Sequence, residues 1–407
     1  MAPVSSPPLP LLPNDVKTGA DVKTGARAPR KTLVFPRKDQ RHRIGVYAPN
    51  YGLEHVSYAM DLPEFRYGAV HGLTARRLFK GSYWAYSPWL AGGGAELVHT
   101  FNHIPCNGDF VVSYELELPR TLGHWSRSQI RRALDRLSAA RCRAILPLSE
   151  AAHDYAARRF DDWGYGHLRA KMQVFRGCVR PPPGFAAPQA TPLSQEPVQL
   201  LFIGGDGLRK GLEAAVAATE ALNREGVATH LTVIGKVTER CYALPDPVSG
   251  AALARRIAES AQITQHPSLP NARIWDLLRN ADALVFPTVD ESLGWVTIEA
   301  ALCGVPAIVG GTFAQPELVD HGVTGWVLPM ERDGDGRWVH LARPSAMAQW
   351  PDLMAEFAAG IMAATREIAA DRMRARQMGA RAARKLSAYR HDRASATLSE
   401  IYRRVLR

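Results

Sequence analysis

ADALVFPTVDESLGWVTIEAALCGVPAIVGGTFAQPELVDHGVTGWVLP, from Ala281 to Pro329, is the stretch that decides the fold of this chain. Its first apolar run, Leu284 to Phe286, follows polar residues and ends at Pro287, which predicts a buried strand of a parallel sheet. Residues Trp295 to Leu302 are apolar with helical spacing and are followed by a glycine and a proline, which predicts a helix. The apolar residues Ala307 to Val309 predict the next buried strand. The predicted order is therefore strand, loop, helix, strand.

The loop between the first strand and the helix, Thr288 to Gly294, carries the residues with chemistry. The start of a helix offers unpaired backbone amides and a partial positive charge, and both suit an anion. Gly294, directly before the helix, lets an anionic group approach the backbone. Glu291 follows the strand, at the edge of the sheet where open α/β sheets place ligands. If a nucleotide binds at this helix start, Glu299 can accept hydrogen bonds from its ribose diol, and Glu291 can meet its other end.

A second loop of similar chemistry follows the strand predicted from Val198 to Ile203. It reads GGDGLRKG, from Gly204 to Gly211, and precedes a helix predicted to run through Leu222. Glycines before a helix start, together with the cations Arg209 and Lys210, are typical of a diphosphate site. The alternative is a glycine turn with two solvated cations. The pattern is neither the dinucleotide G-x-G-x-x-G nor a P-loop, because no G-K-[ST] is present.

Together these segments resemble the nucleotide-sugar site of retaining GT-B glycosyltransferases, specifically glycosyltransferase family 4. The resemblance rests on Glu291 and Glu299 as the family's E-x7-E pair, on ESLG, which begins at the first acid and enters the helix, and on EAALCGVPAIVG, which begins at the second acid. The closing motif PELVDHGVTGWVLP, from Pro316, adds to it. The family implies an α/β fold with two Rossmann-like, doubly wound parallel-sheet domains that face a central cleft. The alternative is a generic βαβ unit with surface glutamates.

The resemblance implies an enzyme that moves a sugar from a nucleotide-diphosphate donor to an acceptor hydroxyl. Its leaving group is a diphosphate, so the main catalytic need is to stabilise negative charge. The predicted catalytic residues are Glu291, Lys210 and Arg209, with Arg209 standing in for an arginine that the family usually has at the position of Gly205. The predicted donor-binding residues are Glu299, Gly294, Ser292, Leu293 and Gly205. Because protein cations replace a metal in this family, neither a metal nor another cofactor is expected.

The first domain matches the family by the order of its elements more than by motif. A strand predicted at Ile44 to Ala48 leads to Gly52, which suits a tight strand-to-helix turn. The resemblance implies that this loop faces the acceptor and the donor phosphates. An ordinary turn is the alternative. The other candidates for the cleft are His99, His103 and Glu115, the last of which stands where the family usually carries a histidine. A lone histidine is more often structural than catalytic.

Residues Arg127 to Arg143 read RSQIRRALDRLSAARCR, with an apolar stripe at Ile130, Leu134 and Leu137 and arginines over the remaining surface. This pattern predicts a basic amphipathic helix that could lie on anionic lipid. The alternative is a solvated helix face packed on its domain. The apolar run MQVF, Met172 to Phe175, is predicted to be the last strand of the first domain.

The chain divides into five predicted segments. They are a disordered proline-rich tail at 1–40, an acceptor-side N-terminal domain at 41–180, a proline-rich linker at 181–197, a nucleotide-sugar-binding domain at 198–385, and a C-terminal helix at 386–407. The last helix has one apolar face, formed by Leu398, Ile401, Tyr402 and Val405. It is expected to pack back on the N-terminal domain, as the family implies.

Composition and charge restrict the number of domains, the cellular location and the kind of partner. The 407 residues are enough for two domains. The five cysteines are scattered without a C-x-x-C pair, so neither a zinc knuckle nor a disulfide framework is indicated. With no apolar run of membrane-spanning length and no signal-peptide pattern, the expected location is cytoplasmic, including the inner face of the cytoplasmic membrane. The net charge of +11 favours an acidic partner, but the arginines are interspersed with acids and no nucleic-acid recognition motif is visible, so a nucleic acid is not the expected partner.

Two other classes of function fit the same features. One is a sugar-nucleotide epimerase or a phosphorylase on the same fold, which product analysis with the donor alone would distinguish. The other is a catalytically silent nucleotide-sugar-binding protein, suggested by Glu115 and Gly205 at positions that depart from the family pattern. For a transferase, the expected acceptor is a glycan or a lipid-linked glycan of the cell envelope.

Overall fold

The computed structural model describes residues 41–48, 62–73, 87–91, 94–121, 125–182, 185 and 197–407. The predicted tail, Gly52 and most of the predicted linker lie outside these ranges. The described chain forms two compact units. Unit 1 contains the residues up to Cys178 together with His391–Arg407, and unit 2 contains Val179–Arg390. None of the helices in the described ranges is long and apolar enough to span a membrane.

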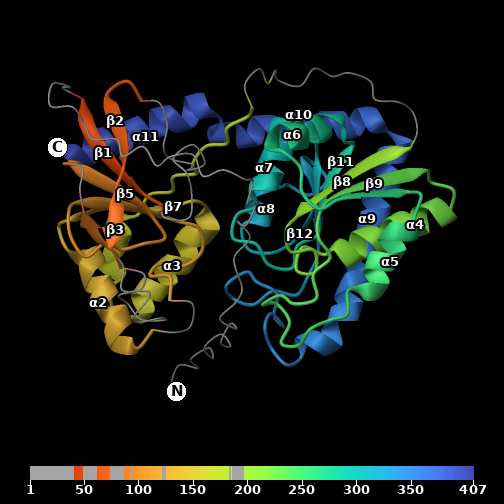
Figure 1. Cartoon of the computed structure of the whole chain (residues 1–407), viewed down its shortest axis with the longest axis horizontal. Coiled ribbons are helices and arrows are strands. Elements are labelled where there is room, and N and C mark those ends of the chain that lie inside the picture. The colour runs from red at the N-terminus through yellow and green to blue at the C-terminus, as the bar shows by residue number, and fades with distance from the viewer. Residues whose placement is uncertain are drawn as a thin grey trace. The chain divides into compact units, whose positions relative to one another are not determined.

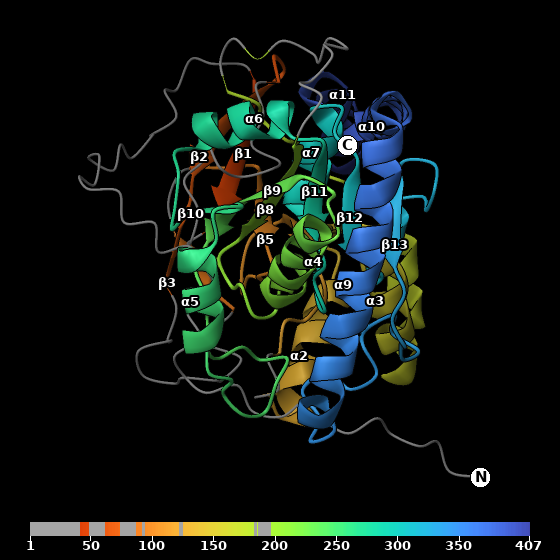
Figure 2. The same ribbon diagram turned by 90° about the vertical axis from the view of Figure 1, so that its right-hand side faces the viewer.

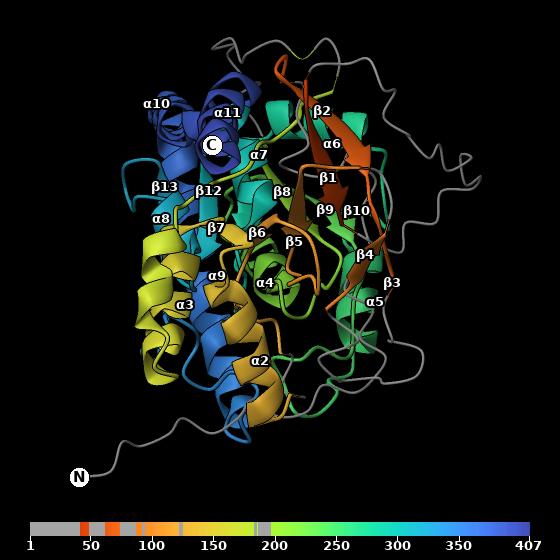
Figure 3. The ribbon, with the colours of Figure 1, turned by 90° about the vertical axis from the view of Figure 1, so that its left-hand side faces the viewer.

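Unit 1 is built on a parallel sheet. Its described strands are β1 (His42–Tyr47), β2 (Phe65–Ala69), β5 (Leu97–Phe101), β6 (Phe110–Tyr114) and β7 (Cys142–Pro147), in the spatial order β2-β1-β5-β6-β7 (Figure 3). Its described helices are α2 (Arg127–Ser138), α3 (Glu150–Asp162) and α11 (His391–Leu406), and β3 (His71–Leu73) pairs with β4 (Trp89–Ala91) in a separate antiparallel ribbon. The chain order reverses between β1 and β5, so the loops after these two strands leave one edge of the sheet together.

Helix α11 belongs to the core of unit 1 although it comes from the end of the chain. Its apolar residues Leu398, Ile401 and Tyr402 are fully buried, and they lie in one core cluster with residues of β1, β5, β6 and β7. These positions recur at helical spacing, so they form one face of the helix. Helix α11, which is sixteen residues long, therefore covers part of the sheet of unit 1.

Helix α2 ends earlier than the sequence predicts. The prediction ran from Arg127 to Arg143, but the helix stops at Ser138 and Cys142 already begins β7. Ala139 turns the chain with an extended ψ of 151°. Lys171 Nζ then donates to three carbonyl oxygens at this end, 2.8 to 2.9 Å away. A cation that satisfies the free carbonyls of a helix C-terminus favours termination there.

The strand predicted for MQVF is wrong. Met172 forms only an isolated bridge with Ile145, and the segment runs beside β7 without extending the sheet. Phe175 donates its amide to the Pro147 carbonyl at 2.9 Å, and its ring is buried in the core of unit 1. Its apolar character is therefore explained by burial of an irregular segment, which periodicity alone does not separate from a short strand.

Unit 2 is also a doubly wound parallel α/β unit. Its strands are β8 (Val198–Gly204), β9 (Thr229–Gly235), β10 (Ile263–His266), β11 (Ala283–Phe286), β12 (Ala307–Gly310) and β13 (Gly325–Leu328), in the order β10-β9-β8-β11-β12-β13. Its helices are α4 (Leu212–Arg224), α5 (Ala251–Glu259), α6 (Asn271–Asn280), α7 (Trp295–Leu302), α8 (Gln315–Leu318), α9 (Ala346–Ala370) and α10 (Arg372–Lys385). Figure 1 shows α6 and α7 on one side of this sheet and α4, α5 and α9 on the other. Figure 2 shows α9 beside β12 and β13, against which it packs.

The topology of unit 2 selects one edge of its sheet. The chain winds from β8 through β9 to β10 in one direction, then from β11 through β12 to β13 in the other. Strands β8 and β11 are paired neighbours, so the order reverses between them. The loops after β8 and β11, residues 205–211 and 287–294, therefore leave the sheet side by side at its switch point. Open α/β sheets bind their ligands at this place.

Candidate functional site

The loop after β8 is held in a tight shape. Thr238 Oγ1 donates to Asp206 Oδ1 at 2.9 Å and accepts the amide of Leu208 at 3.0 Å. Gly211, directly before α4, has a φ of 74°, and a Cβ there would lie 2.2 Å from the carbonyl oxygen of Pro287. Only glycine fits this left-handed position so close to another backbone. The start of α4 is thereby brought against the loop that follows β11.

The two loops meet through an ion pair. Lys210 Nζ, after β8, is hydrogen-bonded to Glu291 Oε2, after β11. Arg209 Nη1 lies 3.8 Å from the same carboxylate oxygen, and the three side chains are 13% to 15% exposed. The ammonium group of Lys210 also sits 4.6 Å from the centre of the Phe286 ring. The structure thus brings together Lys210, Arg209 and Glu291, the three residues that the sequence predicts to be catalytic. We call these three residues the ion cluster.

Arg209 is more enclosed by its own unit than the sequence suggests. Its Nε donates to Asp206 Oδ2 at 3.2 Å, its Nη1 donates to the Asp290 carbonyl, and its guanidinium lies 5.2 Å from the centre of the Tyr242 ring. Burial by itself would lower the pKa of Arg209, but Tyr242, Asp206 and Asp290 outweigh it, so this pKa is raised. Arg209 is therefore a fixed cation, with part of its charge already balanced by its neighbours.

The start of α7 depends on Gly294. This residue has a φ of 90°, and a Cβ on it would lie 2.2 Å from Gln315 Nε2. The Gln315 amide is fully buried, where it donates to the Leu293 carbonyl at 2.8 Å and accepts from Thr297 Oγ1 at 3.0 Å. Leu293 is buried and its carbonyl accepts from Gln315, so this predicted donor-binding residue supports the start of α7 from inside. Ser292, the neighbouring candidate, is partly exposed.

Glu299 lies in α7 with its side chain partly exposed. Its carboxylate makes no hydrogen bond or ion pair with any of the residues that the structure describes. Partial burial without a cation raises the pKa of Glu299 to about 7. No ion pair or hydrogen bond joins it to Lys210, Arg209 or Glu291, so Glu299, in the second turn of α7, is a separate acceptor.

Gly205 is the remaining donor-site candidate. It follows β8 directly, and a Cβ on it would meet no atom within 4 Å. Packing within unit 2 therefore does not require glycine at this position. The space beside it is open to a ligand, which is compatible with a backbone that a phosphate group approaches.

Sequence reasoning missed three residues that surround this cluster. Asp290 lies between Arg337 and Tyr242, and both its side chain and that of Arg337 are buried. Burial opposes ionisation of Asp290, but Arg337, Tyr242 and Arg209 outweigh it and lower the pKa of that carboxyl. Arg337 comes from the segment between β13 and α9, and Tyr242 from the segment between β9 and α5. Neither position has a sequence signal, because spacing does not show which distant arginine reaches a buried acid.

In unit 1 the cleft assignment of His99 is wrong. The ring is fully buried in β5, where Nδ1 lies 2.7 Å from Tyr402 Oη and Nε2 lies 2.7 Å from Ser113 Oγ. Burial lowers the pKa of His99 to about 3, so the ring is neutral. His99 joins the sheet to α11 inside the core, and a ligand at the surface of unit 1 cannot reach it.

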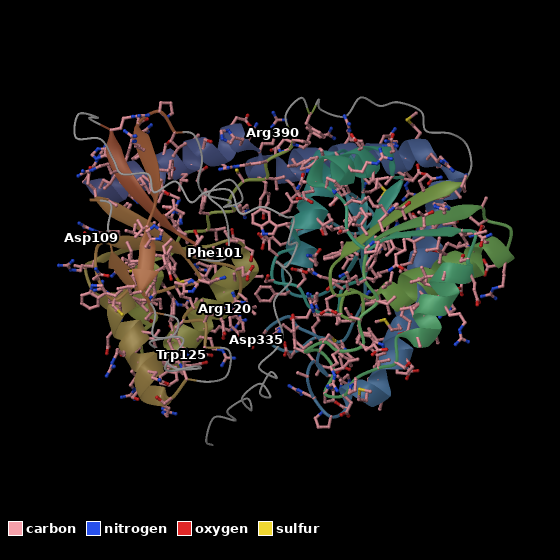
Figure 4. All side chains as sticks on the ribbon, in the orientation of Figure 1. Phe101, Asp109, Arg120, Trp125, Asp335 and Arg390 are labelled. Carbon is pink, nitrogen blue, oxygen red and sulfur yellow. The ribbon has the colours of Figure 1, made fainter. Side chains whose placement is uncertain are left out.

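His103 and Glu115 lie where the sequence places them, after β5 and β6 at the carboxyl edge of the sheet. His103 Nδ1 is 2.6 Å from the Phe101 carbonyl, and its ring meets Tyr47 edge-on at 5.4 Å. Glu115 pairs with Arg120, Nη1 to Oε1, at 3.5 Å. Phe101 and Arg120 are labelled in Figure 4. Both candidates are half-buried, and they remain predictions for the acceptor side.

The described ranges contain no group of three or more His, Cys, Asp or Glu side chains that could hold a metal ion. The expectation of a reaction without a metal stays a prediction.

The part of the chain that carries these loops is similar to known proteins. Residues 186–335 match the family model described as "Glycosyl transferases group 1", and this match contains both loops of the ion cluster. The chain is 31% identical over 129 residues to a glycogen synthase of Mycobacterium tuberculosis, covering 32% of this chain and 30% of that protein. It is 32% identical over 144 residues to a D-inositol 3-phosphate glycosyltransferase of Rhodococcus erythropolis, covering 35% of this chain and 31% of that protein. The aligned region thus spans about a third of these relatives.

Solved structures extend the likeness to most of the chain. HepE of Anabaena, solved in complex with UDP, superposes with a TM-score of 0.54 at 12% identity, over 89% of this chain and 99% of that one. Sucrose-phosphate synthase from Thermosynechococcus elongatus superposes with a TM-score of 0.51 at 18% identity, over 76% of this chain and 74% of that one. At such identities the likeness concerns the fold. The predicted GT-B class, with two Rossmann-like parallel-sheet domains, is confirmed.

Proposed function

We propose that this chain is a retaining glycosyltransferase of family 4 type. It transfers a sugar from a nucleotide-diphosphate sugar to an acceptor hydroxyl. The observation that carries the proposal is the meeting of Lys210 and Arg209 with Glu291 across the two loops at the switch point of unit 2. The match to the group 1 glycosyltransferases covers these same loops.

In this proposal, Lys210 stabilises the charge that develops on the leaving diphosphate. A preorganised cation in a partly enclosed site does so without reorganisation during the reaction. Lys210 and Glu291 are hydrogen-bonded to each other, and in the proposal a bound donor divides this pair. Phosphate oxygens then share Lys210, the amides at the start of α7 add partial positive charge, and Glu291 turns to hydroxyl groups of the donor sugar. Arg209, already bonded to Asp206 and Asp290, holds the loop and adds long-range positive charge.

Glu299 is proposed to hold the ribose of the donor. Two adjacent hydroxyl groups can each donate to one oxygen of an ionised carboxylate, and such charge-assisted bonds are strong. The raised pKa and the lack of a partner among the described residues support this role, because a ligand would supply the missing donors. Protein cations at the diphosphate make the reaction independent of a metal in this proposal.

The acceptor is proposed to be a hydroxyl of a glycan or lipid-linked glycan of the cell envelope. The relatives support a hydroxyl-bearing acceptor without selecting one, since one is named a glycogen synthase and the other an inositol-phosphate glycosyltransferase.

The first experiment is a thermal-shift screen of the full chain against UDP-, GDP- and ADP-glucose, because a ligand of the native state raises the melting temperature. The donor that shifts most is then followed for nucleotide release and transfer with and without EDTA, and NMR of the product reports the anomeric configuration. Inversion, or loss of activity in EDTA, contradicts the corresponding part of the proposal. Lys210→Ala and Glu299→Ala should each lower turnover roughly a hundredfold.

A matched control for the lysine variant is Lys385→Ala, which removes a cation paired with Asp320 at 2.6 Å elsewhere in unit 2. It should keep wild-type turnover. All variants should keep the wild-type melting temperature without ligand to within a few degrees. Turnover at the wild-type level in both site variants would end the assignment.

A further inference from the structure

We propose that Tyr242 and Arg337 are positioning residues for this site. Acting through the buried carboxylate of Asp290, they hold the peptide that carries Glu291 and the guanidinium of Arg209 in the geometry used for transfer. The inference rests on the proposed function of Glu291 and Arg209.

Two residues donate hydrogen bonds to the carboxylate of Asp290. Arg337 Nε donates to Oδ1 at 2.8 Å and its Nη2 donates to Oδ2 at 2.7 Å. Tyr242 Oη donates to Oδ2 at 2.5 Å. Asp290 is 4% exposed and Arg337 is 7% exposed. A bidentate arginine–carboxylate pair is directional as well as strong, so it defines the orientation of the carboxylate and not only its position.

The backbone of Asp290 passes this orientation to the site. Its carbonyl oxygen accepts hydrogen bonds from Thr288 Oγ1, at 3.0 Å, and from Arg209 Nη1. Glu291 is the next residue, so the peptide between them sets the direction in which the Glu291 side chain leaves the loop. Asp290 therefore links Tyr242 and Arg337, which hold its side chain, to Arg209 and Glu291, which its backbone contacts or precedes. We call Asp290, Tyr242 and Arg337 the brace.

Tyr242 also contacts the site directly. The guanidinium of Arg209 lies 5.2 Å from the centre of its ring, within the range of a cation–π contact. The amide of Val289 donates to the Arg209 carbonyl at 3.1 Å, which ties the two loops together. The ring supports the arginine while the hydroxyl holds Asp290, so the two loops share one support.

Arg337 is presented by a rigid turn. Asp333 Oδ1 accepts the amides of Arg337 and Asp335, each at 3.0 Å, and the Asp333 amide donates to the Arg337 carbonyl at 2.8 Å. Asp335, labelled in Figure 4, marks the tip of this turn. The next residue, Trp338, is buried and pairs with Arg332 across the turn. These hydrogen bonds hold the backbone from which the Arg337 side chain extends to Asp290.

The burial of the Arg337–Asp290 ion pair is better explained by a role in orienting the loop than by a contribution to stability. Taking a carboxylate and a guanidinium out of water is costly, and apolar side chains of similar volume are often as stable in the same place. A buried pair that also joins two ligand-facing loops is better explained by the orientation it imposes.

The test begins with amide hydrogen exchange of the full chain, which needs no substrate. Tyr242→Phe removes one hydroxyl, and Arg337→Lys keeps the charge but loses the bidentate bond. Tyr165→Phe is the matched tyrosine control, because Tyr165 Oη donates to Asp135 Oδ1 at 2.6 Å in unit 1. Arg256→Lys is the matched arginine control, because Arg256 binds Glu220 through Nε and Nη2 at 3.1 and 2.8 Å.

Exchange in residues 205–211 and 287–294 should rise several-fold in Tyr242→Phe and Arg337→Lys and stay unchanged in the two controls. Unchanged exchange in both loops would overturn the proposal, whether or not a donor has been found. If exchange rises but the wild type turns over no donor, the proposed function fails and the brace remains.

Turnover then separates positioning from general loosening. With the best donor, kcat should fall roughly ten- to a hundredfold in both brace variants, as expected for a displaced catalytic group, and KM should change much less. In a Glu291→Gln background, Tyr242→Phe should lower the logarithm of kcat by less than about half as much as it does in the wild-type background. The reason is that the group it positions is already lost. Fully independent effects, or a wild-type kcat despite faster exchange, would refute the positioning role.

Discussion

Replacing Glu299 by glutamine should change how the stability of the protein depends on pH. The carboxyl of Glu299 has a pKa raised from 4.5 to about 7, because burial disfavours its charged form and no cation balances it among the described residues. Between these two values the native state binds a proton that the unfolded state has released. The unfolding free energy of the wild type therefore falls as pH rises through this window. Glutamine is neutral throughout and avoids the penalty.

The size of the effect follows from the pKa. A tenfold change in an ionisation equilibrium corresponds to about 1.4 kcal/mol, so the rise from 4.5 to about 7 amounts to at most about 3 to 4 kcal/mol. Solvent reaches part of the side chain, which reduces this figure. The Glu299→Gln variant should match the wild type at low pH and become more stable than the wild type by up to this amount above neutrality.

The assay is urea unfolding of both proteins over a range from about pH 4 to about pH 8.5, with the difference in unfolding free energy plotted against pH. Glu356→Gln, an exposed glutamate of α9, is the matched control, and its difference from the wild type should stay flat. A flat line for Glu299→Gln, or a difference that grows toward acid, would refute the account of Glu299 as a buried, unbalanced carboxylate.

The same variant probes the proposed ribose contact from the ligand side. A hydroxyl that donates to an ionised carboxylate contributes about 1.5 to 3 kcal/mol, so Glu299→Gln should weaken nucleotide binding roughly ten- to a hundredfold above neutrality. The loss should shrink as pH falls, because the wild-type carboxyl then becomes protonated as well. Equal affinity of the two proteins at high pH would leave the stability argument intact and remove the ribose role.

Two further predictions concern residues whose roles the structure decides. Tyr402→Phe removes the hydroxyl that lies 2.7 Å from Nδ1 of the buried His99, and it should lower the unfolding free energy by about 1 to 3 kcal/mol in urea unfolding, with unchanged nucleotide binding. A variant as stable as the wild type would show that this contact is dispensable. Gly294→Ala should cost about 2 kcal/mol and reduce nucleotide binding, because alanine is strained at a φ of 90° and its Cβ displaces the amide of Gln315. Isothermal calorimetry measures the binding, and wild-type affinity would contradict the role assigned to the start of α7.

Much of unit 2 could be predicted because its elements are encoded locally. The helix predicted at Trp295 to Leu302 has these same limits in the structure. Apolar runs bounded by glycine and proline leave little choice of element. Lys210 and Glu291 could be assigned to one site in advance because the family resemblance implies it, whereas the pairing of β8 with β11 came from the structure.

The errors arose where a distant residue decides a local outcome. Helix α2 ends at Ser138 because Lys171 binds its last carbonyls, which the helix's own sequence does not show. His99 is a core residue because Tyr402, from the far end of the chain, reaches it. In both cases the partner lies outside any window of periodicity.

The sequence alone therefore determined the α/β class, the loops that carry the cations and acids, and the edge of the sheet on which they meet. These depend on hydrophobic period, on glycine at helix starts and on the parallel order of strands, all of which act over a few residues. Only the tertiary structure decided that Arg337 and Tyr242 close around Asp290, and that His99 serves the core. Such pairings are set by which side chains the finished fold buries together, and a buried charge accepts whichever partner reaches it.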